Sequence, residues 1–164
     1  MTYSMEKILR RVYASPRTTL ALGIISRSAV VLSVMSYALI LLHHFMIDKM
    51  DAVGIIVASA VPFVIVSILR RLINAKRPYE LYNFYDVPPK KKTARSFPSR
   101  HAFSIFLIAT LAFTVSPGLS IVLLLLGVSL SLSRVLLGVH FIRDVVAGAL
   151  IGVVSGLLGI FIVL

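Results

Sequence analysis

Long apolar stretches alternate with short polar segments along most of the chain. Most of these stretches approach the ~20 residues that a helix needs to cross a hydrocarbon core. They cover residues 28–46, 52–69, 102–115, 119–137 and 145–164. The third is short, which suits a helix whose amino end starts below the membrane surface inside a bundle. The pattern predicts an all-α, polytopic membrane helical bundle of about five transmembrane helices.

The first sixteen residues follow a helical period with two unlike faces. One face collects apolar side chains and the other collects charged ones: Met5, Ile8, Leu9, Val12 and Tyr13 against Glu6, Lys7, Arg10 and Arg11. This predicts an amphipathic helix over residues 1–16 that lies in the membrane interface. A basic tail without structure is the alternative. No uninterrupted apolar core precedes residue 16, so a cleavable signal peptide is not expected.

Composition supports a membrane protein with a single domain over residues 1–164. The chain is 59% hydrophobic, its mean hydropathy is +0.98, and its net charge is +11. A nucleic-acid binder would gather such charge on one soluble face, whereas these basic residues flank apolar spans. We therefore expect membrane lipids, and no nucleic acid, as partners. Cysteine is absent, which excludes disulfides and thiolate metal sites. No feature specifies an oligomeric state.

Basic residues are distributed unevenly if the spans alternate direction. The side that holds the amino terminus, called the active side, receives nearly all of them, and the opposite side keeps only Lys49. The positive-inside rule then predicts a cytoplasmic active side.

Three polar clusters converge on the active side. In the first, Arg70 and Arg77 stand two helical turns apart and so on one helical face. Pro78 biases Arg77 away from helix, which places this cluster where the second span ends. The second opens the third span with Ser99 as an expected N-cap, where free N–H groups and the helix dipole favour phosphate. In the third, His140 and Asp144 are one turn apart if a helix begins near His140, so the carboxylate can hold one ring nitrogen.

These groups suit phosphoryl transfer. Three guanidiniums can surround the oxygens of a transferring phosphoryl group, while one neutral histidine attacks phosphorus and a second protonates the leaving oxygen. Asp144 alone supplies too little oxygen to hold magnesium, so we expect a reaction without metal or cofactor. His43 and His44, at the far end of the first span, receive no role.

The three clusters resemble the signatures of the type-2 phosphatidic acid phosphatase superfamily, which read K-x6-R-P, P-S-G-H and S-R-x5-H-x3-D. They occur here as Arg70-x6-Arg77-Pro78, Pro98-Ser99-Arg100-His101 and Ser133-Arg134-x5-His140-x3-Asp144. The resemblance implies a membrane lipid phosphatase with catalytic residues His140 (nucleophile, forming a phosphohistidine), Asp144 (its orienting carboxylate) and His101 (general acid). It implies phosphate binding by Arg70, Arg77, Ser99 and Arg134, and the cluster also offers Arg100.

Two positions depart from these signatures. Arg70 replaces a lysine, which keeps the charge but exchanges a compact ammonium for a planar fork. Arg100 replaces a glycine, which keeps the backbone N–H but removes glycine's conformational freedom.

The size and the short amphipathic start are similar to undecaprenyl-diphosphate phosphatases of the bacitracin-resistance type. Undecaprenyl diphosphate is therefore the first expected substrate, with phosphatidylglycerophosphate or phosphatidic acid as alternatives. A lipid phosphotransferase would use the same residues, and a non-catalytic lipid-binding protein is a further alternative. Such bacterial relatives usually work at the outer leaflet of the cell membrane, which conflicts with the side that the charges favour.

Two further features concern the surroundings of the clusters. The aromatic residues of the active-side loop, residues 79–97, either anchor it at the interface or line the entrance for a lipid headgroup. Gly148, Gly152 and Gly156 continue the stripe of His140 and Asp144 at four-residue steps, which predicts that this face packs closely inside the bundle.

Overall fold

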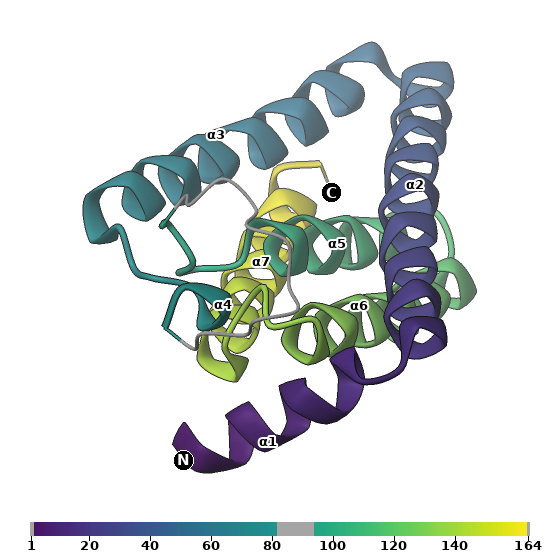
Figure 1. The fold of residues 1–164 in the computed structure, drawn as a ribbon. Helices are drawn as coiled ribbons and strands as arrows, with labels where there is room; N and C mark the ends of the chain where they lie inside the picture. The colour runs from purple at the N-terminus through teal and green to yellow at the C-terminus, as the bar shows by residue number, and fades with distance from the viewer. Residues whose placement is uncertain (1, 82–93, 164) are drawn as a thin grey trace.

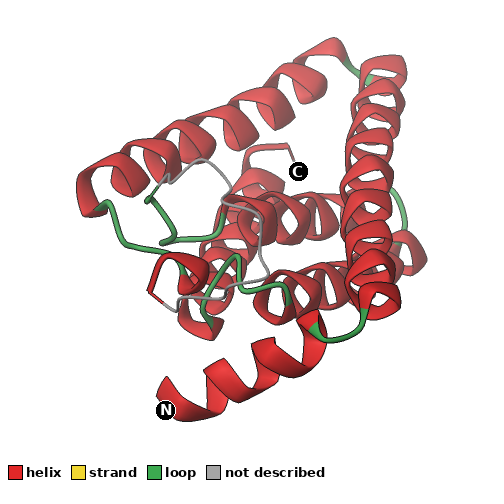
Figure 2. Ribbon diagram, in the orientation of Figure 1, coloured by secondary structure: helices red, strands yellow, loops and turns green. Residues whose placement is uncertain are grey.

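The chain forms a bundle of helices in a computed structural model that describes residues 2–81 and 94–163 (Figures 1 and 2). In chain order the elements are α1 (Thr2–Tyr13), α2 (Pro16–Ile47), α3 (Lys49–Ile73), α4 (Pro78–Leu81), α5 (Arg100–Leu111), the 3₁₀ turn η1 (Ala112–Thr114), α6 (Pro117–Leu136) and α7 (Ile142–Val163). The described residues contain no strand, which confirms the all-α prediction. Most of the predicted active-side loop, including its aromatic residues 82, 84 and 85, lies outside the described residues.

Four helices, α2, α3, α6 and α7, are long and apolar enough to cross a membrane by length and composition. Helix α5, continued by η1, is a shorter apolar helix, as its sequence predicted. Helix α2 is longer than its expected span, because it begins at Pro16 instead of residue 28. Ser15 caps its amino end by accepting a hydrogen bond from the Thr18 N–H at 3.4 Å.

A single residue, Asp48, joins α2 to α3. Its N–H donates to the His44 carbonyl at the end of α2, and its carboxylate accepts from the Met50 N–H at the start of α3, both at 2.8 Å. The extended backbone of Asp48 thus ends one helix and caps the next. Figure 1 shows α2 and α3 diverging from this corner, with α5 packed against both.

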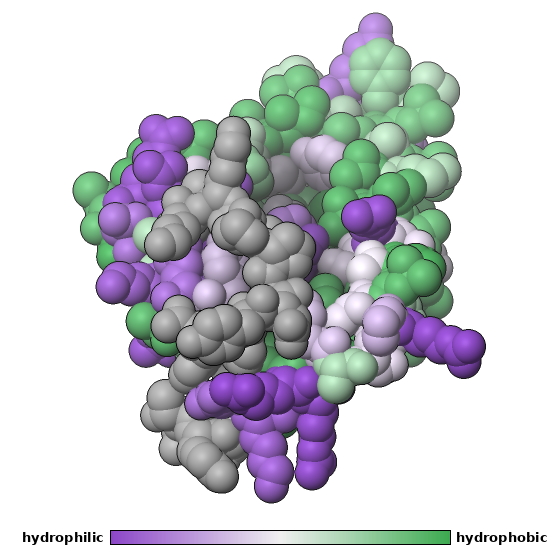
Figure 3. Space-filling model, in the orientation of Figure 1, coloured by the Kyte–Doolittle hydropathy of each residue, from purple (hydrophilic) through white to green (hydrophobic). Residues whose placement is uncertain are grey.

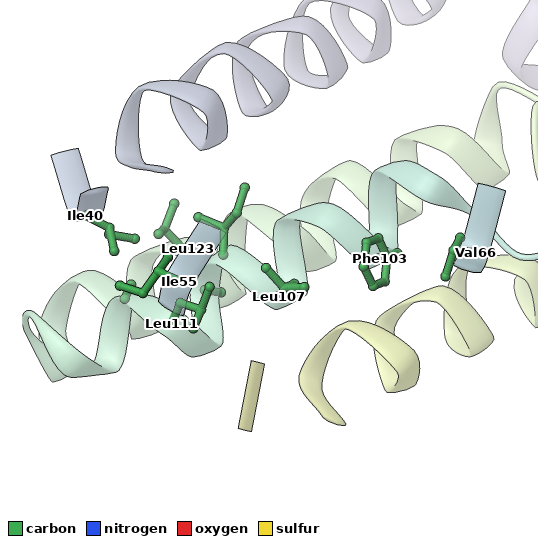
Figure 4. Close-up of a cluster of buried hydrophobic side chains, with 10 residues drawn as sticks. Ile40, Ile55, Val66, Phe103, Leu107, Leu111 and Leu123 are labelled. Atoms are coloured by element: carbon green, nitrogen blue, oxygen red, sulfur yellow. The ribbon is translucent and has the colours of Figure 1, made fainter. Parts of the chain in front are cut away.

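Helix α5 runs through the centre of the bundle and carries most of its core. Phe103, Leu107 and Leu111 follow one another along it, with Val66 of α3 beside Phe103 at one end and Ile55 at the other (Figure 4). Lipid tails are as apolar as leucine, so such helices gain from close packing more than from leaving the lipid. The packing therefore fixes α5 against its neighbours.

The backbones of α5 and α7 approach each other closely along the glycine stripe. A side-chain carbon at Gly148 would overlap the carbonyl oxygen of Ser99, and one at Gly152 would overlap that of Phe103. At Gly156 it would meet Thr110. The structure confirms the predicted packing role of this stripe, because only glycine leaves room for the two backbones to touch.

Helix α1 lies against the segment that leads into α7. Leu9 is completely buried, and its side chain fills the space beside Gly138, which has a φ of +64°. The Tyr13 hydroxyl donates to the Leu137 carbonyl at 3.1 Å. The predicted amphipathic helix is confirmed, and part of its apolar face rests on protein, while Ile8 is exposed.

Hydropathy divides the surface by region (Figure 3). Hydrophilic residues gather over α1, α4 and the end of α3, and hydrophobic residues cover much of the region near the corner of α2 and α3. Exposed apolar side chains are numerous on α2, α3, α6 and α7. The pattern fits a bundle whose sides face lipid and whose polar end reaches the membrane surface.

We expect Gly152→Ala to destabilise the bundle, because the added methyl group would overlap the Phe103 carbonyl oxygen and lie 3.0 Å from the Leu107 nitrogen. Overpacking of this kind costs about 1–3 kcal/mol. Thermal unfolding in detergent measures the effect as a lowered Tm. Gly23→Ala is the control, since no atom lies within 4 Å of a carbon added there. An equal change in both variants would contradict a tight contact between α5 and α7.

Candidate active site

All the sequence-predicted site residues lie at one end of the bundle, on five different segments. Arg70 ends α3, Arg134 ends α6, and Arg77 precedes α4. Ser99, Arg100 and His101 begin α5, while His140 and Asp144 flank the start of α7. Ser99, His140 and Asp144 are buried, and Arg70 nearly so. The fold therefore brings together residues that are up to 74 positions apart in sequence.

The predicted pairing of His140 with Asp144 is present. Nδ1 of His140 lies 3.5 Å from Oδ2 of Asp144. Helix α7 begins at Ile142, two residues later than the sequence suggested, so His140 stands in the preceding turn. Asp144 occupies the third position of α7 and accepts a hydrogen bond from the Phe141 N–H at 3.0 Å, as acidic residues at helix starts commonly do.

The turn that carries His140 is folded back onto the end of α6. The Arg134 carbonyl accepts hydrogen bonds from the N–H groups of Val139 and His140, at 3.0 and 3.3 Å. Gly138 adopts a positive φ within this turn, a conformation that side chains disfavour. The spacing of the third motif therefore reflects a turn of defined length between two helices.

Ser96 is a site residue that the motif analysis missed. It is completely buried, and its hydroxyl donates to Oδ2 of Asp144 and lies 3.3 Å from Nδ1 of His140. Its backbone N–H donates to the Ala75 carbonyl at 2.8 Å. Ser96 stands three residues before Ser99, outside the second signature, so only the folded chain reveals its contact with the third.

This network determines which nitrogen of His140 carries the proton. The single hydroxyl proton of Ser96 is given to Asp144, so both neighbours of Nδ1 present acceptors. Nδ1 must therefore donate, which leaves Nε2 with its lone pair. Burial lowers the pKa of His140, and the charges of Arg77 and Arg70 act in the same direction, against the hydrogen bond to Asp144. The ring is neutral near pH 7.

The Arg70 side chain forms hydrogen bonds with the backbone at and just before the second motif. Its Nη1 donates to the carbonyl of Ser96 at 3.1 Å and to that of Pro98. Its other guanidinium N–H groups form no hydrogen bond with the described residues. One nitrogen of the planar guanidinium thus holds the loop before α5. A lysine at this position would contact the loop through a compact ammonium, without the planar geometry of the guanidinium.

Arg77 and Arg70 do not share a helical face, contrary to the expectation from their spacing. Helix α3 ends at Ile73, because Asn74 adopts a left-handed conformation with a φ of 45°. Arg77 lies beyond the helix, and its Nη1 donates to the Val139 carbonyl at 3.4 Å. It reaches the site through the turn that carries His140.

Arg134 provides a buried donor. Its Nε has no hydrogen-bond partner among the described residues, although it is shielded from solvent. A buried unpaired donor is costly, and an anion is the natural partner for a guanidinium in such a position. The charge of Arg77 also acts on Arg134, so the two guanidiniums lie near each other.

Ser99 and His101 lie where the second motif predicted. Ser99 caps α5, accepting from the Ala102 N–H at 3.4 Å, and its own N–H donates to the Asp144 carbonyl at 2.8 Å. His101 is half-buried in the first turn of α5. It interacts electrostatically with His140, Arg134 and Arg70. The two imidazoles therefore lie near each other at this end of the bundle.

The electrostatics of the site favour an anion. Guanidiniums and two imidazoles surround one carboxylate. Its Oδ2 has its own hydrogen-bond donors, and its Oδ1 lies 3.7 Å from Nε of Arg143. Within residues 2–81 and 94–163, no group of three histidine or acidic side chains gathers as metal ligands do. The donor set thus matches a phosphoryl group, whose oxygens accept hydrogen bonds from guanidiniums and helix N–H groups.

A protein-family model described as the PAP2 superfamily matches residues 50–163, which include all three motifs. The chain belongs to the PAP2 superfamily. Membership confirms the family that the motifs predicted. The individual roles of the site residues are proposals that follow from geometry.

Three known proteins are similar to this PAP2 chain. The bacitracin transport permease protein BcrC of Bacillus licheniformis is 29% identical over 106 residues, which is 62% of this chain and 52% of BcrC. The chain thus spans about half the length of that relative. Aquifex aeolicus LpxE, known from its crystal structure, has 27% sequence identity to this chain and a TM-score of 0.69. The match covers 94% of this chain and 93% of LpxE.

The third similarity concerns the fold. The PAP2-type phosphatidylglycerolphosphate phosphatase of Bacillus subtilis, known from its crystal structure, is 21% identical with a TM-score of 0.70. The match covers 97% of this chain and 84% of that one. It confirms a multi-pass membrane architecture.

We expect Ser96→Ala to lower kcat about tenfold or more, because Asp144 loses its hydroxyl donor and His140 loses part of its support. An unmet buried acceptor costs about 1–3 kcal/mol. Phosphate-release kinetics measure the change. Ser120→Ala is the matched control, since it removes another buried hydroxyl, which donates to the Ala109 carbonyl at 2.7 Å far from the site. If Ser96→Ala and Ser120→Ala lose equal stability and have equal kcat values, then Ser96 serves only the stability of the fold.

Proposed function

We propose that the protein is an integral phosphatase of the cell membrane that removes a terminal phosphate from a lipid phosphate or diphosphate through a phosphohistidine on His140. The main support is the buried His140, whose Nδ1 faces Asp144 and Ser96 so that Nε2 keeps a lone pair. Facing guanidiniums supply the charge that the oxygens of a phosphoryl group require. The proposed reaction uses neither metal nor cofactor.

In the first step, Nε2 of His140 attacks phosphorus and a nitrogen–phosphorus bond forms. The bond from phosphorus to the lipid oxygen breaks, and His101 gives that oxygen a proton. Asp144 stabilises the charge that the ring gains, while Arg70, Arg77, Arg134 and the N–H groups at the start of α5 hold the phosphoryl oxygens. In the second step, water attacks phosphorus and gives a proton to His101. The nitrogen–phosphorus bond breaks, its electron pair returns to Nε2 of His140, and inorganic phosphate leaves.

Charge couples the general acid to the substrate. Burial of His101 opposes a positive ring, and repulsion from neighbouring guanidiniums acts in the same direction. A dianionic phosphoryl group offsets this repulsion, so the imidazolium form of His101 becomes favourable when substrate binds. The acid is thereby charged at the moment when a leaving oxygen needs its proton.

Apolar cavities beside His101 suit the lipid chain. One cavity of about 340 Å³ is lined by His101 together with residues of α2, α3, α5 and α6. A second of about 370 Å³ shares Val34, Phe63 and Ser104 with it and continues between α2 and α3. A lipid bound there would keep its chain against apolar side chains and its phosphate at the polar end of the bundle.

Several lipids fit this description. Undecaprenyl diphosphate is the first candidate, supported by the similarity to BcrC and by the resemblance to bacitracin-resistance phosphatases. The similarity to the Bacillus subtilis phosphatase favours phosphatidylglycerophosphate, and phosphatidic acid is related to it. A phosphotransferase would replace water by a second lipid in the second step. A lipid carrier without turnover is the remaining alternative, which the word permease in the name of BcrC suggests.

We expect His140→Ala to abolish phosphate release, on the order of 10⁴-fold or more, because no other group can accept the phosphoryl group. The measurement uses detergent-purified protein with lipid phosphates and diphosphates in excess chelator. Rapid denaturation should also trap a phosphoprotein that is stable in alkali and labile in acid, and this species should be absent from His140→Ala.

His43→Ala is the matched control for this experiment, since it removes an exposed imidazole at the opposite end of α2. It should retain full turnover. Activity that disappears with chelator would contradict a reaction without metal. Binding of lipid phosphates without any turnover would favour the carrier instead.

The charge distribution predicts that the active side is cytoplasmic. The chain has no cysteine, so Lys76→Cys and Lys49→Cys each create a single thiol, at the two ends of α3. An impermeant thiol reagent applied to intact cells should label Lys49→Cys and spare Lys76→Cys. The reverse pattern would assign the pocket to the outer leaflet, as in the bacterial relatives that recycle lipid carriers.

A further inference from the structure

Arg100 is a cation at the mouth of the pocket that has no hydrogen-bond or ion-pair partner among the described residues. It is the first residue of α5, and its side chain is exposed. It lines the cavity of about 340 Å³ together with His101 and Ser104. The PAP2 signature has glycine at this position, so the guanidinium is an addition of this chain to the common site.

The direction of the leaving group depends on the two imidazoles. His140 is buried, whereas His101 is half-buried and lines the cavity. In an in-line displacement, the leaving oxygen departs on the side opposite the attacking nitrogen. That oxygen must face His101, which gives it a proton under the proposed function. The part of the substrate beyond the leaving oxygen therefore enters the cavity that Arg100 also lines.

Apart from Arg100, His101 and two serines, Ser33 and Ser104, the walls of this cavity are apolar. Val30, Val34 and Ile105 line them, as a lipid chain requires. Arg100 precedes His101 at the start of α5, and its charge acts on both His101 and Arg70. The group attached to the leaving oxygen thus meets a guanidinium as well as apolar side chains.

A fourth guanidinium has little to bind in a lipid monophosphate. There the leaving group is an alcohol, which His101 neutralises with its proton, and the transferred phosphoryl group already has Arg70, Arg77 and Arg134. In a lipid diphosphate the leaving group is itself a phosphate monoester, which keeps negative charge. Arginine pairs with phosphate through two parallel hydrogen bonds.

We propose that Arg100 binds the phosphate that stays on the lipid, and that it gives this protein a preference for lipid diphosphates over lipid monophosphates. The inference rests on the proposed function and names its substrate class. The nitrogen–phosphorus bond forms at His140 as the bond from that phosphorus to the bridging oxygen breaks. The bridging oxygen departs with the lipid phosphate, whose charge Arg100 and the His101 proton balance. Water then releases inorganic phosphate, so the products are a lipid monophosphate and phosphate.

The test compares two probes with one chain, farnesyl diphosphate and farnesyl phosphate, on the purified full-length protein. The wild type should have the higher kcat/KM on the diphosphate and should accumulate farnesyl phosphate. Arg100→Gln keeps the length of the side chain and removes its charge. It should lower the ratio of the two kcat/KM values about 10–100-fold, the range for a hydrogen bond to a charged group. Arg100→Lys should restore part of the ratio.

Arg71→Gln is the matched control, because it removes one exposed charge at the end of α3. Its ratio should equal that of the wild type. The inference is overturned if Arg100→Gln leaves the ratio unchanged, if Arg71→Gln lowers it equally, or if the wild type prefers farnesyl phosphate. Absence of phosphate release from both probes and from longer lipid phosphates would instead reject the proposed function.

Discussion

The buried carboxylate of Asp144 holds the polar end of the bundle together. Its Oδ2 accepts from the Ser96 hydroxyl and the Phe141 N–H and faces the His140 ring, while its main-chain carbonyl accepts from the Ser99 N–H. A buried charge costs several kcal/mol unless such partners surround it. The loops that carry the second and third motifs must therefore dock before the carboxylate is stable. Folding of this end and assembly of the site are one event.

The glycine stripe of α7 makes these contacts geometrically possible. Ser99 can donate to the Asp144 carbonyl only if the start of α5 reaches the backbone of α7, and Gly148 leaves the space for it. In water, a larger side chain could be offset by hydrophobic burial. In lipid, close packing is the principal gain. The positions of the reacting groups thus depend on helix packing that begins at the site and continues along α7.

Much of this architecture was readable from local sequence. The apolar runs predicted the spans, Ser99 predicted the cap of α5, and the four-residue step from His140 to Asp144 predicted their contact. These signals lie within one or two helical turns, where the period of the helix fixes the geometry. The stripe at Gly152 was predictable for the same reason.

The errors arose where the chain leaves helical geometry. Arg70 and Arg77 were expected on one face, but the left-handed Asn74 ends α3 between them. The start of α2 was placed too late, because hydropathy reports where lipid is contacted and not where Ser15 caps the helix. Ser96 was missed because its partner in the third motif is 48 residues away. A contact between distant segments leaves no periodic signal in a single sequence.

The charges in the pocket distinguish the groups suited to stabilise a transition state from those suited only to bind a lipid chain. Arg77 repels both Arg70 and Arg134, and the buried Nε of Arg134 lacks an acceptor among the described residues. These costs fall as negative charge accumulates on phosphoryl oxygens, and they fall furthest in the transition state, where that charge is spread over the equatorial oxygens. Under the proposed function, the apolar cavity would hold the lipid chain equally in substrate and transition state, so it would increase occupancy without accelerating the chemical step. Selectivity for phosphate would then belong to the guanidiniums, and tolerance of different chains to the helices that face lipid.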